Sequence, residues 1–149
     1  LALARRDNGK HLEAVDAWKQ ALSFRREDSS LVRSLGVEYA QAGKLEEARN
    51  VLEGAAMLQP DDGLIRGNLG GIYLGLGQYE EAKESLVRAL RLAPDNTSQW
   101  LGNLAQVHLA LGAFAAAMEA VETALATDPG NEKLTRLKQR IQLEKGTYE

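Results

Sequence analysis

Two histidines, His11 and His108, are the residues best suited to proton transfer or metal binding near neutral pH. They lie far apart in the chain, and the sequence contains no cysteine. A protein zinc site needs several ligands at close spacing, and nucleophilic catalysis needs a base beside its nucleophile. Neither arrangement can be assembled from this sequence. We therefore predict no metal site and no catalytic triad.

Two carboxylate pairs, Glu46-Glu47 and Glu80-Glu81, could in principle act as general acids and bases. Each pair falls in the first turn of an expected helix, where negative charge complements the helix dipole. The glycines between 67 and 77 could suggest a phosphate-binding loop. They lie within a helical apolar pattern, however, and no Gly-Lys-Ser/Thr follows them. We predict that the chain is not an enzyme and uses no cofactor.

The composition excludes several further classes of protein. The chain has 149 residues, 44% of them hydrophobic, and a net charge of −3. A nucleic-acid-binding surface is basic, so we expect no nucleic-acid partner. No apolar run approaches the roughly 18 residues that span a bilayer, so we expect no membrane insertion. Because the chain starts at Leu1 and not at methionine, we expect a fragment of a longer protein. Its cellular compartment is unknown, with the cytoplasm as the default.

The chain is built from a repeat. Gly43 and Gly77 are 34 residues apart, as are Pro60 and Pro94. One extra residue near Thr97 lengthens the next spacing to 35. A fixed period of this length is typical of solenoid proteins. The same columns continue in a third copy with Gly112, Ala117, Ala124 and Pro129.

Each repeat is predicted to be a pair of antiparallel helices. Within residues 29–62, apolar residues recur at helical spacing in two runs. Gly43 separates these runs, as a left-handed C-cap glycine would. Pro60 cannot continue a helix and stops the second run. The small alanines of the second run allow close contact inside each pair.

This pattern resembles the tetratricopeptide repeat (TPR). Three units hold the family's residues, and the first unit is incomplete because Arg26 stands where the proline is usual. The residues that carry the resemblance are Leu35, Gly36, Tyr39, Ala48, Leu52, Ala55 and Pro60; Leu69, Gly70, Tyr73, Ala82, Leu86, Ala89 and Pro94; and Leu104, Ala105, His108, Ala117, Val121, Ala124 and Pro129.

The resemblance implies an all-α fold, a right-handed α-solenoid of antiparallel helix pairs with about nine helices. We expect one solenoid over 1–149, with units 1–28 (partial), 29–62, 63–96 and 98–131, and with 132–149 as a cap helix or a truncated fifth unit. The expected helices are 1–8, 11–25, 29–42, 45–58, 63–76, 79–92, 98–111, 114–127 and 132–145.

In this family the first helices of the pairs line a concave groove that usually holds an extended peptide or a partner helix. The resemblance therefore implies a protein-interaction module with an unidentified protein or peptide partner. A homo-oligomeric scaffold and a substrate-docking or regulatory arm of a larger enzyme are the alternatives. Transferring the repeat register gives these groove residues: Arg33, Ser34, Val37, Gly67, Asn68, Gly71, Asn103, Gln106, Arg136 and Arg140.

Asn68 and Asn103 occupy equivalent positions in two Gly-Asn-Leu triplets. A side-chain amide offers donors and an acceptor, so it can pair with any peptide backbone. Beside them, Gly67, Gly71 and Gly75 share one helix face. Each costs about 1 kcal/mol relative to alanine, and the repeat gives none of them a packing role. We predict that a ligand approaches this backbone closely; the alternative is drift that stable neighbouring repeats tolerate.

Two further expectations concern the charge of the groove and self-association through the convex side. The columns that would form a full carboxylate clamp hold other residues here, yet Arg33, Arg136 and Arg140 predict a mildly basic groove that favours acidic peptides. On the convex side, Ala115-Ala116 replace the Glu-Glu pairs of earlier units. This uncharged patch could support self-association, although alanine is also a harmless residue on a helix surface.

Overall fold

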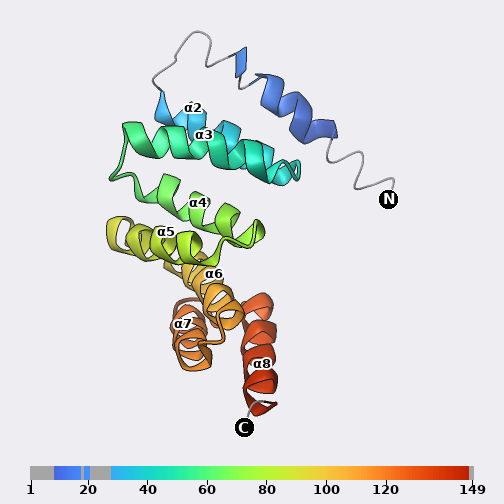
Figure 1. Cartoon of the computed structure of the whole chain (residues 1–149), viewed down its shortest axis with the longest axis vertical. Helices are drawn as coiled ribbons and strands as arrows, with labels where there is room; N and C mark the ends of the chain where they lie inside the picture. Colours follow the sequence, from blue (N-terminus) through green and yellow to red (C-terminus); the bar gives the residue numbers. More distant parts are fainter. Residues whose placement is uncertain (1–8, 18, 21–27, 148–149) are drawn as a thin grey trace.

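A computed structural model describes residues 9–17, 19–20 and 28–147, and no strand occurs among them. Residues 9–17 and 19–20 are helical (Figure 1). The remaining helices are α2 (Ser29–Gln41), α3 (Leu45–Leu58), α4 (Gly63–Gly75), α5 (Tyr79–Leu92), α6 (Thr97–Ala110), α7 (Phe114–Thr127) and α8 (Glu132–Gly146), with a short 3-10 helix η1 (Pro94–Asn96) before α6.

The seven helices predicted from residue 29 onward are all present, and their ends agree with the structure to within one residue. The predicted helix over 1–8 lies outside the described residues, as do residue 18 and residues 21–25 of the predicted helix 11–25. The all-α solenoid expected from the repeat is confirmed. None of the described helices is long and apolar enough to cross a membrane.

Local signals explain these boundaries. The side chains of Asp28 and Asp62 accept hydrogen bonds from backbone N–H groups in the first turns of α2 and α4, and Asn131 does the same for α8. Gly43, Gly77 and Gly112 follow the first helices with φ between +72° and +76°. Only glycine adopts this left-handed conformation without strain, so it ends each first helix.

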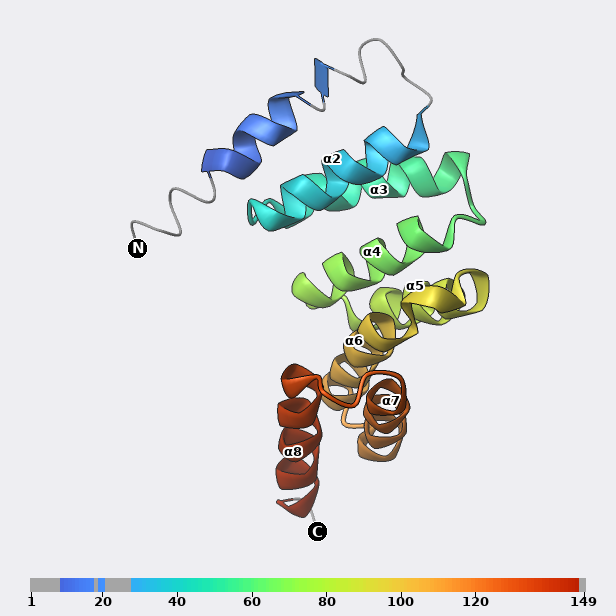
Figure 2. The ribbon, with the colours of Figure 1, turned by 180° about the vertical axis from the view of Figure 1, so that it is seen from behind.

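The stacking of the pairs identifies the inner side of the solenoid. The first helices touch one another in succession, because α2 contacts α4, α4 contacts α6 and α6 contacts α8. Within the described part of the chain, the second helices α3, α5 and α7 make no such contacts with one another. The first helices therefore lie at the smaller radius, on the concave side. Figures 1 and 2 show that the axes of α6–α8 are inclined to the axes of α2–α5.

Inside each pair, a small residue on the first helix makes room for a larger one on the second. A Cβ added to Gly36 would lie 2.5 Å from Cγ of Leu52, and a Cβ added to Gly70 would lie 2.5 Å from Cγ of Leu86. In the next pair, Ala105 and Val121 occupy the same two columns and are both fully buried in one cluster. In this pair alanine replaces the glycine of the first helix, and valine replaces the leucine of the second helix, so the added methyl is offset by a smaller partner.

A polar seam joins neighbouring pairs. The hydroxyl of Tyr73 in α4 donates a hydrogen bond of 2.7 Å to Glu53 in α3. Arg49 in α3 pairs with Glu46 at 2.6 Å and donates to Gln78, in the turn before α5, at 3.3 Å. Burial, followed by the hydrogen bond to Glu53, raises the pKa of Tyr73 to about 12.

Replacing Tyr73 by phenylalanine is expected to lower the free energy of unfolding at pH 7 by about 1 kcal/mol, because the bond to Glu53 is lost. The folded-state pKa lies above the ordinary value of 10.0. The stabilising effect is therefore complete below pH 10 and is lost as the pH rises towards 12. Urea unfolding at pH 7 and thermal melts above pH 9 measure both effects.

The matched control is Tyr79→Phe, since the hydroxyl of Tyr79 makes no hydrogen bond to any described residue. Equal stabilities of the Tyr73→Phe and Tyr79→Phe proteins would show that the bond to Glu53 contributes nothing.

Candidate functional site

Three pockets adjoin along the concave side. The first, of about 270 Å³, lies between α2, α4 and α6. It contains no charged side chain. Its lining residues are Val37, Ala40, Gln41, Leu45, Gly67, Asn68, Gly71, Ile72, Gln99 and Asn103.

The second pocket, of about 630 Å³, lies between α6 and α8. It shares Gln99 and Asn103 with the first pocket. Its lining residues are Asp95, Ser98, Gln99, Gly102, Asn103, Gln106, Asp128, Asn131, Lys133 and Leu134.

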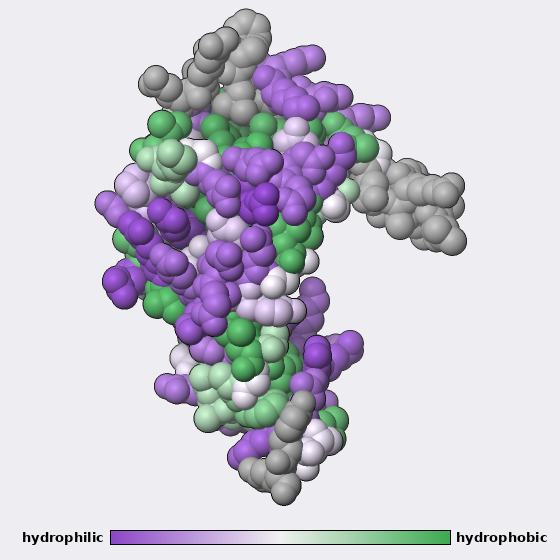
Figure 3. Space-filling model, viewed as in Figure 1, coloured by the Kyte–Doolittle hydropathy of each residue, from purple (hydrophilic) through white to green (hydrophobic). Residues whose placement is uncertain are grey.

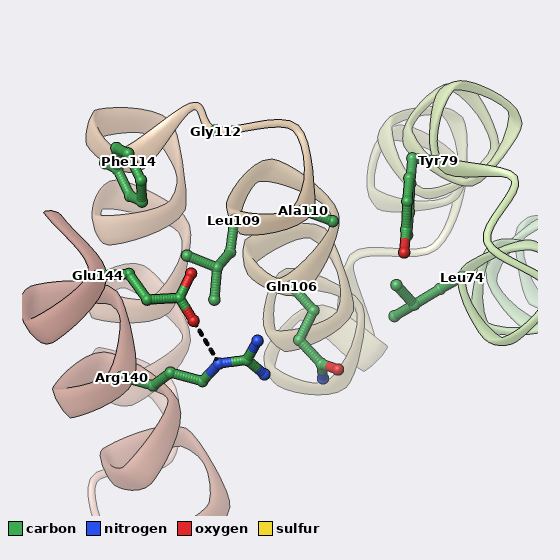
Figure 4. Close-up of a pocket in the computed structure, with 9 residues that line it drawn as sticks. All are labelled: Leu74, Tyr79, Gln106, Leu109, Ala110, Gly112, Phe114, Arg140 and Glu144. Atoms are coloured by element: carbon green, nitrogen blue, oxygen red, sulfur yellow. Dashed lines mark hydrogen bonds and ion pairs between the residues drawn. The ribbon is translucent and has the colours of Figure 1, made fainter. Parts of the chain in front are cut away.

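The third pocket, of about 570 Å³, reaches the end of α8 and shares Gln106 with the second. Figure 4 shows Leu74 and Tyr79 on one side of it and Arg140 with Glu144 on the other. Leu109, Ala110, Gly112 and Phe114 complete its lining. Because Gln99, Asn103 and Gln106 are shared, the three pockets form one continuous strip across α2, α4, α6 and α8. We call this strip the inner groove.

The amides of the inner groove are open. Asn68 and Asn103, from equivalent positions of α4 and α6, line the same first pocket. The side-chain amides of Asn68, Gln99, Asn103 and Gln106 make no hydrogen bond to any other residue that the structure describes. Each of these residues is half-buried or exposed. Their donors and acceptors are therefore available to solvent or to a ligand.

Gly67 has a packing role that sequence reasoning missed. It is buried, and a Cβ at this position would overlap the indole ring of Trp100, which α6 presses against α4. Trp100 itself is 3% exposed. The prediction that no contact inside the chain explains Gly67 is therefore wrong. Gly67 also lines the first pocket.

The same contact recurs one pair later. A Cβ on Gly102 would lie 2.8 Å from Cδ2 of Leu134 in α8. Trp100 and Leu134 share one repeat column, 34 residues apart, and Gly67 and Gly102 share another. Large residues in the first column fit small ones in the second. The sequence contained this signal, but it becomes readable only when first helices of neighbouring pairs are compared.

The other two glycines of the stripe also face side chains of this chain. A Cβ on Gly71 would lie 3.3 Å from Nδ2 of Asn103, and one on Gly75 would lie 3.0 Å from Cδ1 of Leu45. Both distances are tight for a carbon contact. Gly71 thus leaves the space that the Asn103 amide occupies in the first pocket.

Three predicted groove residues, Arg33, Ser34 and Arg136, line none of the three pockets. Arg33 is half-buried on α2. The hydroxyl of Ser34 donates to the carbonyl oxygen of Ser30 at 2.9 Å, within its own helix. Val37, Gly67, Asn68, Gly71, Asn103, Gln106 and Arg140 do line the inner groove.

Two of the three arginines that were expected to make the groove basic are paired with carboxylates. Arg136 pairs with Glu132 at 3.2 Å and Arg140 pairs with Glu144 at 2.7 Å, each within α8. These carboxylates neutralise the two arginines locally. In addition, Asp95 and Asp128 line the second pocket. The second pocket, in the middle of the groove, therefore holds two acidic residues beside one basic residue, Lys133.

The two histidines have different surroundings. His11 Nδ1 lies 2.8 Å from a carboxylate oxygen of Glu38, which ties the first described helical segment to α2. His108 occupies the column of Tyr39 and Tyr73. Burial and then the charge of Lys83 lower the pKa of His108. Among the described residues, no group of histidines and carboxylates could hold a metal ion.

Two family models match the sequence. Both are described as tetratricopeptide repeat, one over residues 1–63 and the other over residues 61–129. No curated protein is significantly similar to the chain in sequence. TPRs generally form a non-catalytic protein-interaction fold.

Several solved structures are similar to the chain. A MamA protein from Desulfovibrio magneticus RS-1 is 19% identical, with 97% of this chain and 85% of that chain covered and a TM-score of 0.83. The thermophilic TPR protein TTC0263 from Thermus thermophilus is 24% identical, with coverages of 95% and 78% and a TM-score of 0.76. The second TPR domain of human RPAP3, solved in complex with an HSP70 peptide, is 23% identical, with coverages of 74% and 92% and a TM-score of 0.69.

At these identities the structural likeness concerns the fold alone. The helix pairs stack as that fold requires, with a left-handed glycine closing each first helix of the described pairs. Both family models fall on those pairs, and together they match residues 1–129. The chain belongs to the tetratricopeptide-repeat family.

Proposed function

We propose that this chain is a non-catalytic interaction module that holds an extended polypeptide segment in its inner groove. The observation that supports this most directly is the row of open amides along the groove, contributed by Asn68, Gln99, Asn103 and Gln106. A bound helix has already satisfied its backbone hydrogen bonds internally. An extended segment has not, so its N–H and C=O groups can pair with these amides.

The related fold of the second TPR domain of human RPAP3 was solved with an HSP70 peptide, which shows that this architecture can hold a peptide. That likeness concerns the fold, so the HSP70 peptide does not identify the partner of the present chain. The unpaired amides of Asn68, Gln99, Asn103 and Gln106 favour an extended ligand here.

The double substitution Asn68→Ala with Asn103→Ala is expected to weaken binding of an extended peptide by about tenfold, because two hydrogen-bonding side chains are removed. The probes are peptides enriched on the wild-type protein from a random nine-residue display library. Fluorescence anisotropy measures their affinity, and circular dichroism should show an unchanged thermal melt.

Asn50→Ala is the matched control, because Asn50 is an exposed asparagine on α3 that lines none of the three pockets. If the double variant bound as tightly as the Asn50→Ala protein, the amides would have no part in binding. If the library yielded no enriched peptide at all, the proposed function itself would be refuted.

The outer side of α7 favours self-association as a second candidate function. Ala115 is exposed, and with Phe114 and Met118 it lines an open pocket of about 390 Å³. Figure 3 shows a largely apolar surface over α7. The equivalent positions of α3 and α5 hold the pairs Glu46-Glu47 and Glu80-Glu81, so the first turn of α7 lacks the negative charge that those helices carry there. Glu119, Glu122 and Lys145 also line the pocket.

Ala115→Glu with Ala116→Glu gives α7 the charge of its neighbours and is expected to abolish any self-association. Sedimentation velocity across a concentration series measures the oligomeric state of both proteins. Gln139→Glu with Gln142→Glu adds the same charge to exposed positions of α8 and serves as the control. A wild-type protein that stays monomeric at high concentration would rule out this second function.

A further inference from the structure

The geometry points to a specific class of partner for the inner groove. We propose that it selects an extended segment with one bulky apolar side chain, seated in the first pocket, and one lysine or arginine a few residues away, seated in the second. This inference rests on the proposed function, because it concerns the ligand of the same groove. It reverses the preference for acidic peptides that the arginines had suggested.

The first pocket is suited to an apolar side chain. Val37, Ala40, Leu45 and Ile72 supply apolar walls, and no charged residue lines it. Its volume of about 270 Å³ exceeds the roughly 150 Å³ of cavities that bind benzene. One leucine, methionine or phenylalanine side chain therefore fits. The amides of Asn68 and Asn103 line the same pocket, where they can hold the backbone that carries this side chain.

The second pocket has the opposite chemistry. Asp95 and Asp128 line it, against a single basic residue, Lys133. Asp95 forms no ion pair with any residue that the structure describes, while Asp128 accepts a hydrogen bond of 2.8 Å from Asn131. A cationic side chain in this pocket could pair with the carboxylate of Asp95 or of Asp128. An acidic one would meet both of them, which charge complementarity disfavours.

The third pocket carries no net charge, so it does not offset the preference of the second pocket for a cationic side chain. Nε of Arg140 lies 2.7 Å from Glu144, so the one basic group of that pocket is already paired (Figure 4). An acidic peptide consequently finds no unpaired basic residue in the first or third pocket. Charge selection in the groove is concentrated at Asp95 and Asp128.

The helix spacing sets the register between the two side chains. Neighbouring helices in contact lie about 8–10 Å apart. The first pocket is centred near α4 and the second between α6 and α8, so one to two spacings separate them. An extended chain rises about 3.3 Å per residue. The apolar and basic residues of the ligand should therefore stand about two to six residues apart.

The test is the sequence profile of the nine-residue display library on four proteins. Wild type is expected to enrich peptides with a bulky apolar residue and a lysine or arginine at that separation. Val37→Asp should remove the apolar preference, and Asp95→Lys should replace the basic preference by an acidic one. In an enriched peptide, replacing the apolar residue by alanine should weaken binding about tenfold.

The fourth protein is a control with Val87→Asp and Glu84→Lys, which makes one identical substitution and one equal charge reversal at exposed positions of α5, outside the groove. Its profile should match that of wild type. Enriched peptides that are acidic, or that lack the apolar residue, would overturn this inference and leave the proposed function standing. A Val37→Asp profile identical to that of the control would overturn the assignment of the first pocket. Absence of any enrichment would overturn both proposals.

Discussion

Replacing Gly67 by alanine is expected to destabilise the protein by about 2 kcal/mol, although alanine is the better helix former. The added methyl would overlap the indole of Trp100, and that ring is buried with 3% exposure. A rigid aromatic ring cannot yield as a flexible side chain would, so α4 and α6 must move apart. Urea unfolding measures the loss, and the fluorescence of Trp100 should shift to longer wavelength.

The control is Gly54→Ala, because Gly54 lies inside α3 and a Cβ there would meet no atom within 4 Å. That variant is expected to gain about 0.5–1 kcal/mol through helix propensity alone. The comparison separates the two explanations of Gly67. If its role were only to admit a ligand, Gly67→Ala would stabilise the free protein much as Gly54→Ala does.

Gly70→Ala is the second substitution with a large expected effect, a loss of about 1–2 kcal/mol after the gain in helix propensity. A Cβ there would lie 2.5 Å from Cγ of Leu86, a side chain with no exposed surface. Adding Leu86→Val should recover most of this loss. The pair Ala105 and Val121 already fills the same two columns in the next repeat.

Chemical denaturation of Gly70→Ala, Leu86→Val and the double variant forms a double-mutant cycle. Leu86→Val alone should also lower stability, because it leaves a cavity of about one methylene. The expected sign of the coupling is favourable, with the double variant more stable than the sum of the single losses. Additive losses would show that the two columns do not share one packing volume.

Most of the fold follows from short-range signals. Asp62 caps α4 by bonding to N–H groups two and three residues ahead, and Gly77 ends a first helix through its own backbone freedom. Such interactions involve neighbours in sequence, so the residue types alone reveal them. This is why the helix ends from residue 29 onward were predicted to within one residue.

The groove was harder to predict, because its properties depend on which residues of different helices meet. Asn68 and Asn103 could be placed together from the repeat register. The contact of Gly67 with Trp100 was missed, since it becomes readable only when the column of Trp100 and Ile65 is compared with the glycine column of the neighbouring first helix. The pairing of Arg136 with Glu132 and of Arg140 with Glu144 was readable, because each pair has the four-residue spacing of helical ion pairs.

The packing of Trp100 on Gly67 also has a mechanical consequence. At the two joints between first helices, α4 with α6 and α6 with α8, a large side chain packs against a glycine. The joint between α4 and α6 has the bulkier of the two, the indole of Trp100, whereas the next has Leu134. It is at this joint that the helix direction turns (Figures 1 and 2). The size of the side chain at each joint therefore contributes to the angle between successive first helices. A smaller residue at position 100 would change the angle between α4 and α6, and with it the separation of Asn68 on α4 from Asn103 on α6 across the first pocket.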